Sequence, residues 1–322
     1  MTCLVTGGAG YIGSHIIASL TAHGYRSVVV DDLSTGVEAR IAGLPLLVAD
    51  ISDPASIETL TAFMRDHGVT SIIHTAAHKS VPESMVNPLG YYRVNVGGTI
   101  NVLRAAEAAQ VSAFVFSGTA AVYGMADGRV TEQSPTTPIN PYGESKLAGE
   151  QLLADLGRIG ALRATSLRYF NVAGTGSTLG ADNGATNLIP QALRRISQGV
   201  SPEIYGSDYP TPDGTCVRDY IHVVDLAEAH IAALAAIEAD PTWSFRVFNV
   251  GTGTGYSVRE VLDLAIEVSE TSLGYRLVDR RPGDPASIVA DPQRITHELG
   301  WSASHNLRDM VSSAWNGMTG TA

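Results

Sequence analysis

A tyrosine and a lysine one helical turn apart are the residues of this sequence best suited to do chemistry. Tyr142 and Lys146 occur in the segment Pro-Tyr-Gly-Glu-Ser-Lys, where a helix would place the ammonium near the phenol. A tyrosine ordinarily has a pKa of about 10, and a neighbouring cation lowers it, so the pair can act as a base toward an alcohol. The same spacing also occurs by chance on surface helices, so it needs a second observation.

The second observation is a glycine-rich turn near the start of the chain. Gly7, Gly10 and Gly13 follow the apolar segment Thr2–Thr6. Small residues at a strand-to-helix turn let the backbone approach a pyrophosphate and let the helix pack closely on its sheet. The spacing is G-x-x-G-x-x-G rather than the strict dinucleotide-binding motif, so the turn alone is a weak signal.

Asp31 strengthens the prediction of a dinucleotide site. It follows the next apolar segment, Ser27–Val30, and Asp32 stands beside it, where dinucleotide-binding folds place the carboxylate that binds the ribose hydroxyls. Because a carboxylate repels a 2′-phosphate, the sequence favours NAD over NADP. Asp50, after the segment Leu44–Val48, is a weaker candidate for the adenine edge.

A hydroxyl at the end of another expected strand completes the set. Thr119 ends the segment Phe-Val-Phe-Ser-Gly-Thr, at the sheet edge where ligands bind in parallel folds. Its hydroxyl can share a hydrogen bond with a substrate alcohol and relay its proton, although it can also cap the turn that follows. The candidate residues together predict hydride transfer at a carbon that bears a hydroxyl group.

The elements that must position these residues alternate along the chain. Strands are expected at Thr2–Thr6, Ser27–Val30, Leu44–Val48, Ser71–His74, Ala113–Phe116, Thr165–Arg168 and Phe245–Val250. Helices are expected at Tyr11–His23, Ala55–Asp66, Leu89–Ala109, Tyr142–Leu156 and Val258–Glu270. Alternation with continuous apolar strands predicts an α/β fold, a Rossmann-type doubly wound parallel sheet with helices on both faces.

The second half of the chain is more irregular. Gly174–Gly184 is rich in Gly, Ser, Thr and Asn, and Tyr205–Gly214 is a polar segment with Pro, Gly and Asp, typical of loops that build binding pockets. We expect a NAD-binding domain at 1–171, to which a segment at about 215–250 returns, and a smaller mixed α/β lobe at 172–322.

The bulk composition describes a folded protein without a nucleic-acid surface. The 322 residues are 44% hydrophobic and 16% charged, with a mean hydropathy of +0.09, enough for two modest domains. The net charge of −11 argues against nucleic-acid binding. Cys3 and Cys216 fit neither a disulfide framework nor a metal site, so no metal is expected and both are interpreted as buried thiols.

No segment predicts a leader peptide or a membrane span. The glycine-rich turn begins at Gly7, which leaves no room for a signal or transit peptide. The best apolar stretch, Ala229–Ile237, is too short to cross a membrane and includes His230. We therefore expect a cytoplasmic protein without a membrane or nucleic-acid partner.

Longer motifs occupy nearly the whole chain. They are Gly7–His15, His74–Ser84, Ala120–Gly124, Pro141–Lys146, Leu167–Asn171, Asp208–Thr215, Val217–Val223 and Arg280–Asp284. With these motifs the chain resembles the extended short-chain dehydrogenase/reductase superfamily and, within it, the NAD-dependent epimerase/dehydratase family and its UDP-glucose 4-epimerases. The glycine turn and the Tyr/Lys pair specify only the superfamily, whereas the polar segment through Arg218-Asp-Tyr-Ile-His222 points to the epimerases.

The resemblance implies a reaction. Tyr142 would remove the proton of the sugar 4-hydroxyl while C4 gives its hydride to the nicotinamide, and Thr119 would bridge the 4-oxygen. Lys146 would hold the nicotinamide ribose and lower the pKa of Tyr142. The 4-keto sugar would turn about its diphosphate and regain hydride on the other face, interconverting UDP-galactose and UDP-glucose. NAD would stay tightly bound, and helices 89–109 and 142–156 would pair two chains in a homodimer.

The resemblance also assigns binding residues. To NAD it assigns Gly7, Gly10, Tyr11, Ile12, Gly13, Asp31, Asp32, Leu33, Ser34, Thr35, Gly36, Asp50, Ile51, Thr75, Ala76, Ala77, Lys79, Asn95, Tyr142, Lys146 and Phe170. To the UDP-sugar it assigns Lys79, Thr119, Tyr142, Asn171, Asn187, Leu188, Tyr205, Arg218, Arg281, Asp284 and Ile288. Arg218 and Arg281 suit a diphosphate because guanidinium matches its charge and geometry, and Tyr205 can stack on uracil.

Some positions depart from the common family pattern. Thr119 stands where many relatives have Ser, and Tyr205 replaces a common Phe, so a hydroxyl and a stacking face are kept. Ile288 occupies a position where some relatives have a larger Tyr, which suggests tolerance of N-acetylated sugars.

Alternative functions stay open at this point. A 4,6-dehydratase or decarboxylase would carry an acidic residue directly after Thr119, where this chain has Ala120 and Ala121. A 4-epimerase acting on UDP-N-acetylglucosamine, UDP-glucuronate or UDP-xylose is the closer alternative. A non-catalytic NAD-binding relative would typically have lost Tyr142 or Lys146.

Overall fold

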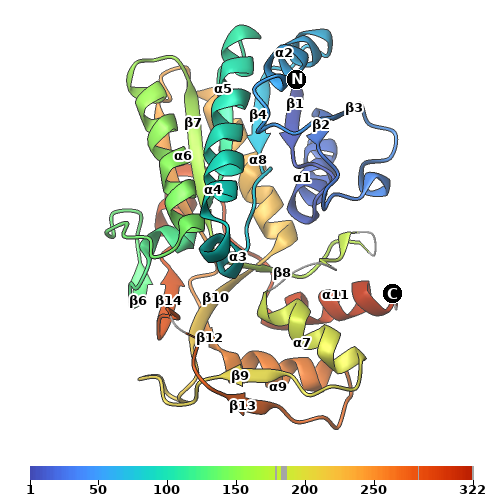
Figure 1. The fold of residues 1–322 in the computed structure, drawn as a ribbon, viewed down its shortest axis with the longest axis vertical. Helices are drawn as coiled ribbons and strands as arrows, with labels where there is room; N and C mark the ends of the chain where they lie inside the picture. The colour runs from blue at the N-terminus through green and yellow to red at the C-terminus, as the bar shows by residue number, and fades with distance from the viewer. Residues whose placement is uncertain (178–179, 183–186, 282, 321–322) are drawn as a thin grey trace. The chain divides into compact units, whose positions relative to one another are not determined.

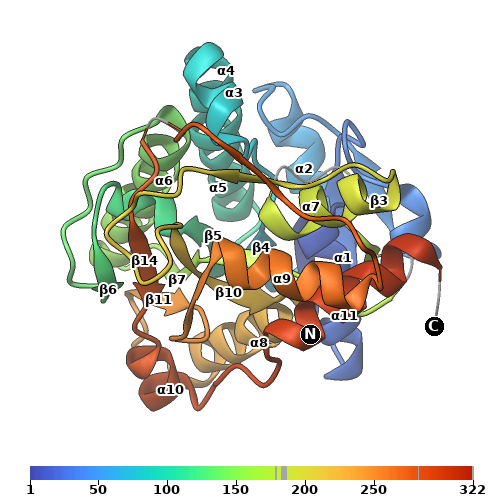
Figure 2. The ribbon, with the colours of Figure 1, turned by 90° about the horizontal axis from the view of Figure 1, so that it is seen from below.

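The computed structural model describes residues 1–177, 180–182, 187–281 and 283–320. Parts of the expected polar segment Gly174–Gly184, and Pro282 of the motif Arg280–Asp284, therefore lie outside the described residues. The chain folds into two compact units (Figures 1 and 2). The first unit comprises Met1–Val122, Pro138–Arg168 and Ala227–Phe248, and the second comprises Tyr123–Thr137, Tyr169–Leu226 and Asn249–Ala322.

A seven-stranded sheet forms the centre of the first unit, and it confirms the predicted α/β class. Its order is β11–β7–β5–β4–β1–β2–β3, and neighbours β1 with β2, β1 with β4, β2 with β3, and β4 with β5 are parallel. The strands are β1 (Thr2–Thr6), β2 (Arg26–Asp31), β3 (Leu46–Val48), β4 (Ser71–His74), β5 (Ala113–Thr119), β7 (Arg163–Tyr169) and β11 (Phe245–Val250). The strand order reverses between β1 and β4, where doubly wound folds bind their ligands.

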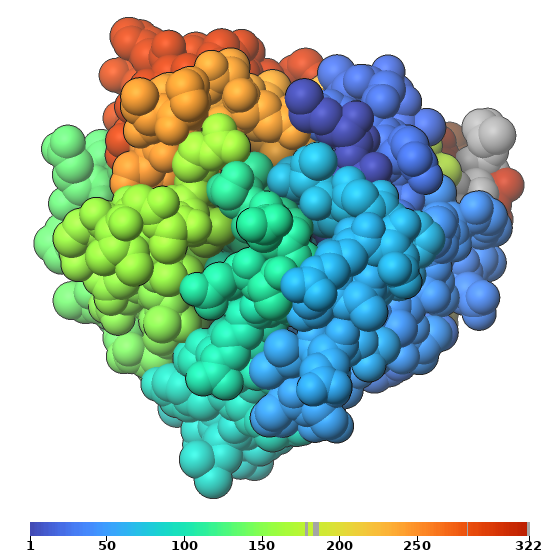
Figure 3. Space-filling view, turned by 90° about the horizontal axis from the view of Figure 1, so that it is seen from above, coloured from blue at the N-terminus to red at the C-terminus, as the bar shows by residue number. Residues whose placement is uncertain are grey.

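Helices cover both faces of this sheet (Figure 1). They are α1 (Tyr11–Ala22), α2 (Ser56–Asp66), α5 (Gly98–Ala108), α6 (Pro141–Arg158) and α8 (Val223–Ala239). Seen from above, α5 lies between α2 and α6 (Figure 3). On the other face the Ser19 hydroxyl of α1 donates to Glu228 of α8.

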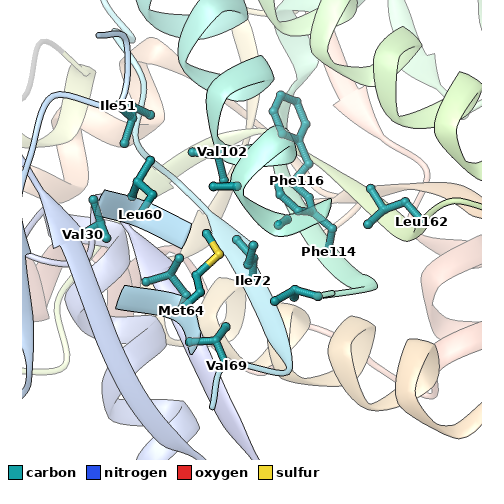
Figure 4. Packing of buried hydrophobic residues seen from close by; sticks show 14 of the residues in the cluster. Val30, Ile51, Leu60, Met64, Val69, Ile72, Val102, Phe114, Phe116 and Leu162 are labelled. Carbon is teal, nitrogen blue, oxygen red and sulfur yellow. The ribbon is translucent and has the colours of Figure 1, made fainter. Parts of the chain in front are cut away.

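The main hydrophobic core lies between the sheet and helices α2, α5 and α6 (Figure 4). Leu60, Val102 and Leu153 come from these helices, and Ile72 and Phe114 come from the sheet. Each of these side chains is fully buried. The central strands β1, β4 and β5 are buried along their whole length, which accounts for their continuous apolar sequence.

The expected continuous helix Leu89–Ala109 is wrong in detail. The segment divides into α4 (Pro88–Tyr91), a π-helical turn at Tyr92–Gly97 and α5. Because the π turn contains a residue more per turn than an α-helix, it changes which side chains face inward. Its Asn95 side chain accepts a hydrogen bond from the His78 N–H (2.8 Å) and donates to the Ser145 hydroxyl (2.9 Å).

Other elements lie close to their expected bounds. β1, β4 and β11 match the predicted ranges, and β5 continues three residues past Phe116 to Thr119. The helix of the Tyr/Lys pair begins at Pro141, where the Asn140 side chain accepts the Gly143 N–H (2.9 Å) as an N-cap. Two further helices, α3 (Val81–Val86) and α8, were not predicted, nor were two 3₁₀ turns, Glu38–Ile41 and Ala120–Tyr123.

The second unit is more regular than its sequence indicates. A five-stranded sheet has the order β12–β10–β14–β6 with β8 paired to β10, and a smaller sheet pairs β13 with β9. Its strands are β6 (Gly128–Val130), β8 (Asn171–Ala173), β9 (Glu203–Tyr205), β10 (Val217–His222), β12 (Gly255–Ser257), β13 (Arg276–Val278) and β14 (Ser287–Ala290). Its helices are α7 (Leu188–Ser197), α9 (Val258–Val268), α10 (Gln293–Leu299) and α11 (Leu307–Thr319).

The register of the five-stranded sheet brings together residues that are distant in the sequence. Arg218 of β10 lies opposite Ile288 of β14, and Tyr220 lies opposite Asn171 of β8. Across the residues that the structure describes, no helix is long and apolar enough to span a membrane.

Candidate active site

The glycine-rich turn joins β1 to α1 through close backbone contacts. Gly7 has a φ of +69°, and its N–H donates to the Val30 carbonyl (2.7 Å). A Cβ built on Gly13 would collide with the Gly7 carbonyl oxygen. A side chain at Gly13 would therefore push α1 away from the turn.

The first turn of α1 begins at a glycine rather than at a capping side chain. Its N-cap, Gly10, is extended, and no side chain among the described residues caps the helix. The first N–H groups of a helix lack partners within it and attract anions. Tyr11 and Ile12 begin the helix at this position. The turn and the uncapped N-terminus fit the pyrophosphate of a dinucleotide.

The Asp31 carboxylate is buried directly beside this turn. Its Oδ2 accepts the Ala9 N–H (3.0 Å) and its Oδ1 accepts the Leu33 N–H (2.9 Å). Burial raises the pKa of Asp31, and these two hydrogen bonds oppose that rise. Leu33 has a φ of +57°, an uncommon conformation for a leucine and one that clusters at functional sites.

The other predicted cofactor residues of this unit gather at the same edge of the sheet. They follow four neighbouring parallel strands: Gly7 and Gly10–Gly13 after β1, Asp31–Gly36 after β2, Asp50 and Ile51 after β3, and Thr75–Ala77 with Lys79 after β4. Ser34, through its hydroxyl and its N–H, donates to the exposed Asp32 carboxylate. The carboxyl ends of adjacent parallel strands form the ligand crevice of such folds.

Asp50, like Asn95 in the π turn, is held in position by hydrogen bonds with its neighbours. Asp50 Oδ1 accepts the N–H and hydroxyl of Ser52 at 2.8 and 2.6 Å. Burial raises the pKa of Asp50, but the Ser52 hydrogen bonds and the Arg93 guanidinium outweigh it and lower the pKa overall.

Phe170, also predicted to contact NAD, belongs to the second unit, where its N–H donates to the Val250 carbonyl (3.2 Å).

Tyr142 and Thr119 meet at the junction of α6 and β5. The Thr119 hydroxyl accepts the Ala121 N–H (3.1 Å), so it caps the turn that follows, and it lies close enough to the Tyr142 phenol to affect the pKa of that group. Its role toward a substrate alcohol stays a prediction. Burial raises the pKa of Tyr142, and the Thr119 hydrogen bond opposes that rise. A cation is therefore required to bring the phenol into a useful range.

Lys146, one turn further along the same helix, is a buried group that can supply such a cation. Its side chain is anchored to β5, where the ammonium donates to the Ser117 carbonyl (2.8 Å) and hydroxyl (2.9 Å). The ammonium also lies 4.8 Å from the centroid of the Phe116 ring. Burial lowers the pKa of Lys146 to about 7, and the Glu150 carboxylate opposes that fall. Such a lysine exchanges its charge near neutral pH.

The sequence interpretation did not single out Ser117, which receives both Lys146 hydrogen bonds. It stands two positions before Thr119 in the same strand. Alternate residues of a strand point to the same face, so a search for hydroxyl side chains at that spacing would have found it.

Arg218, Asp284 and Ile288 form one group in the second unit. The Arg218 guanidinium donates to the Asp284 carboxylate at 3.5 Å and to the Val217 carbonyl at 2.9 Å. The buried Ile288 lies opposite Arg218 in the sheet register. Asn171 joins the same strand through a hydrogen bond from its side chain to the Asp219 carbonyl (2.9 Å).

Tyr205 and Arg281 form a second group in this unit. The Arg281 guanidinium stacks on the Tyr205 ring at 3.6 Å from its centroid, and the Tyr205 hydroxyl donates to Glu203 (2.8 Å). Asn187 is the N-cap residue of α7, and Leu188 begins that helix and packs on its apolar neighbours. The predicted UDP-sugar residues of this unit thus stand in separate groups, and Lys79, Thr119 and Tyr142 belong to the first unit.

A doubly wound sheet with a buried Tyr/Lys pair at its carboxyl edge defines a dinucleotide-dependent protein of the short-chain dehydrogenase/reductase type. The model of the NAD dependent epimerase/dehydratase family matches residues 3–251. The chain belongs to this family.

Individual relatives are similar over nearly the whole chain. A UDP-glucose 4-epimerase of Azospirillum brasilense is 47% identical, with 96% of this chain and 89% of the relative covered. A crystal structure of a Stenotrophomonas maltophila UDP-glucose 4-epimerase with bound NAD and formylated UDP-arabinopyranose has a TM-score of 0.94 at 38% identity, covering 99% and 98% of the two chains. A UDP-Glc/GlcNAc 4-epimerase of Campylobacter jejuni has a TM-score of 0.86 at 35% identity, covering 99% of each chain.

Proposed function

We propose that this protein is a NAD-dependent UDP-glucose 4-epimerase that interconverts UDP-galactose and UDP-glucose. The observation that carries the proposal is the junction of β5 and α6, where Thr119 contacts Tyr142 and a buried Lys146 is fixed to Ser117. The similarity to UDP-glucose 4-epimerases over nearly the full chain supports the same activity. The residues of this junction suit a reaction in which one hydroxyl group is first oxidised and then formed again.

The first unit supplies the cofactor site and the proton chemistry. NAD, when bound, accepts the hydride of C4 and returns it to the opposite face. The N-terminus of α1 would hold the pyrophosphate, and the Asp31 carboxylate would accept hydrogen bonds from the ribose hydroxyls. NAD ends each turnover unchanged, so its release would only slow the enzyme. A site whose residues follow four neighbouring strands favours tight binding of the cofactor.

Tyr142 is the base and Lys146 keeps it reactive. The phenolate oxygen takes the proton of the 4-hydroxyl and gives it back to the 4-oxygen after the sugar has turned. The Lys146 ammonium stabilises the phenolate against the burial that raises its pKa. The Thr119 hydroxyl hydrogen-bonds the 4-oxygen during both the oxidation and the reduction. The same three residues, Thr119, Tyr142 and Lys146, therefore serve both configurations of the sugar.

The second unit supplies the groups for the nucleotide diphosphate. Arg218 and Arg281 provide guanidinium groups for the phosphates, and Tyr205 provides a ring for uracil. Asn171, Asn187, Leu188 and Asp284 complete the nucleotide side, and Ile288 faces the sugar. In this proposal the two units divide the work into a NAD-binding domain and a UDP-sugar-binding lobe.

We propose a homodimer in the cytoplasm, joined through α5 and α6. An open groove of about 250 Å³ lies between these helices and is lined mainly by apolar residues, among them Ile100, Leu103, Leu152 and Leu156. Contiguous apolar surface of this kind marks interaction sites, and a second copy of the same two helices would cover it. A Leu103→Glu/Leu152→Glu variant that sediments as a monomer, beside a dimeric wild type, would support this. A monomeric wild type would overturn it.

Ile288 favours a second substrate class, the N-acetylated UDP-sugars. Its side chain is smaller than the tyrosine of some relatives, and a similar protein acts on both UDP-Glc and UDP-GlcNAc. We expect measurable turnover of UDP-N-acetylglucosamine. No turnover beside efficient use of UDP-galactose would contradict this expectation.

The direct test is incubation of the purified protein with UDP-galactose, without added NAD. Chromatography would follow UDP-glucose, with UDP-N-acetylgalactosamine and UDP-xylose in parallel. Conversion to an equilibrium mixture is expected, and it would establish both the activity and a retained cofactor. No conversion even with added NAD would contradict the proposed activity and favour another UDP-sugar or a non-catalytic NAD-binding protein.

A further inference from the structure

A buried ion pair lies one helical turn beyond Lys146. Glu150 of α6 faces Arg168 of β7, and their side chains are only 4% and 6% exposed. Arg168 binds the carboxylate in a bidentate manner, with Nη2 at 2.7 Å from Oε2 and Nε at 3.1 Å from Oε1. The Ser166 hydroxyl donates to the same Oε1 at 2.8 Å. The Glu150 carboxylate is therefore fixed from two positions on β7.

The same carboxylate lies against the strand that holds the catalytic pair. A Cβ built on Gly118 would come within 3.0 Å of Glu150 Oε1 and 2.6 Å of the Ser166 hydroxyl. Gly118 stands between Ser117, which binds the Lys146 ammonium, and Thr119, which binds the Tyr142 phenol. The close approach needs a glycine, and it places a fixed negative charge against Gly118, the residue between these two contacts in the strand.

The titratable and charged groups near Lys146 in the fold come from several elements. Glu150 lies on its own helix, Tyr142 one turn before it, and Arg168 on β7 behind the carboxylate. His74 of β4 is fully buried, and burial together with the Lys146 charge lowers its pKa to about 3, so it stays neutral in the assay range. Glu150 is the group that favours the charged form of Lys146, against burial.

We propose that Glu150 is a positioning residue of the reaction, whose carboxylate, held by Arg168 and Ser166, keeps Lys146 charged and in place beside Tyr142. This inference rests on the proposed function for its consequence in turnover. The alternative is an ion pair with only a structural role. Buried ion pairs often contribute little net stability, so such a pair beneath a reactive lysine calls for a role beyond folding.

The proposal fixes the direction of a pH effect. In Glu150→Gln the Lys146 ammonium loses the negative charge that stabilises it, so the pKa of Lys146 falls. Lys146 is then neutral at a lower pH, and it no longer stabilises the Tyr142 phenolate above that pH. The alkaline limb of kcat should move to lower pH, and the ionisation of Tyr142 to higher pH, each by about one pH unit or more. A structural role would lower the melting temperature without either change.

The experiment measures both quantities in the NAD-loaded protein. The ionisation of Tyr142 is read from the ultraviolet difference spectrum of tyrosinate, with the Tyr142→Phe spectrum as the baseline, and it needs no turnover. Glu144→Gln, an exposed carboxylate of the same helix, is the matched control and should leave both values unchanged. The titration therefore decides the inference even if UDP-galactose is not a substrate.

A second variant protects the test against misfolding. Glu150→Gln leaves the buried Arg168 without its carboxylate, whereas Glu150→Gln/Arg168→Met removes both charges, which buried pairs often tolerate. Folded variants whose Tyr142 ionisation moves to higher pH would support the proposal. Folded variants that keep the wild-type ionisation and the wild-type alkaline limb would overturn it and leave Glu150 a structural role.

Discussion

The candidate reactive residues of the first unit and the candidate phosphate-binding residues of the second are prepared in different ways. Lys146 and Thr119 are buried and already have the protein partners they need, on β5 and α6. Arg218 and Arg281 are more accessible, and each contacts a group of the second unit itself, Asp284 for Arg218 and the Tyr205 ring for Arg281.

The difference indicates what each set of residues contributes. Fixed, buried groups lower a reaction barrier because they need no rearrangement as charge develops. Arginines that rest on an acid or an aromatic ring must exchange that partner for a phosphate, so part of their interaction is already used in the free protein. Substitutions in the first unit should therefore reduce kcat, and those in the second should raise KM.

The largest effect is expected for Tyr142→Phe. The phenol is the only group in the proposed mechanism that takes the substrate proton, so kcat should fall by about 10²- to 10⁴-fold. NAD and UDP should still bind, because the ring and its packing are kept. Turnover assays with UDP-galactose and calorimetry with UDP would check both parts. Near-normal turnover would exclude Tyr142 as the base.

Arg218→Ala should raise KM for UDP-galactose by about tenfold to a hundredfold, the range of a lost hydrogen bond to a charged group. kcat should change far less, because Arg218 acts equally on both sugar configurations. Arg294→Ala is the control, since Arg294 lies on α10 and pairs with Glu298 (2.8 Å). A fall in kcat at unchanged KM would remove the contrast between the two units.

Asp31→Asn should weaken retention of NAD by about tenfold, the cost of a lost charged hydrogen bond. It should also reduce the preference for NAD over NADP, because the charge that repels the 2′-phosphate of NADP is gone. Asp53→Asn is the matched control, since that carboxylate is exposed, lies outside the residues assigned to NAD and accepts the Ala55 N–H. The NAD content of purified protein and reconstitution with each cofactor would measure both effects. An equal loss in both variants would contradict the role of Asp31.

Arg281→Lys should have the smallest effect. The lysine keeps the positive charge but loses the planar stack on Tyr205, which at an exposed site contributes about 0.5–1 kcal/mol. KM for UDP-galactose should rise by a few-fold at most, and the melting temperature should hardly change. Steady-state kinetics and thermal unfolding would check this. A large rise in KM would mean that the flat guanidinium, rather than its charge, binds the phosphate.

Much of the first unit was predictable because its signals are local. Continuous apolar segments predicted β1 and β4 at their observed bounds, and helical periodicity placed Tyr142 and Lys146 on one face of α6. The π turn at Tyr92–Gly97 was not predicted, because the sequence pattern was tested against a single α-helical period, and a short π turn within a helix has no local sequence signal of its own. The helices of the second unit, except α9, were also missed.

The sequence by itself determined the fold class, the glycine turn, the carboxylate of Asp31 at the end of a strand and the spacing of Tyr142 and Lys146, because backbone sterics and helical geometry act between near neighbours. Only the tertiary structure decided that Ser117 anchors Lys146, that Glu150 meets Arg168 beneath Gly118, and that Ile288 lies opposite Arg218. These contacts join segments far apart in the chain. They depend on which strands pair and on how much surface the whole fold buries. A short stretch of residues determines neither of these.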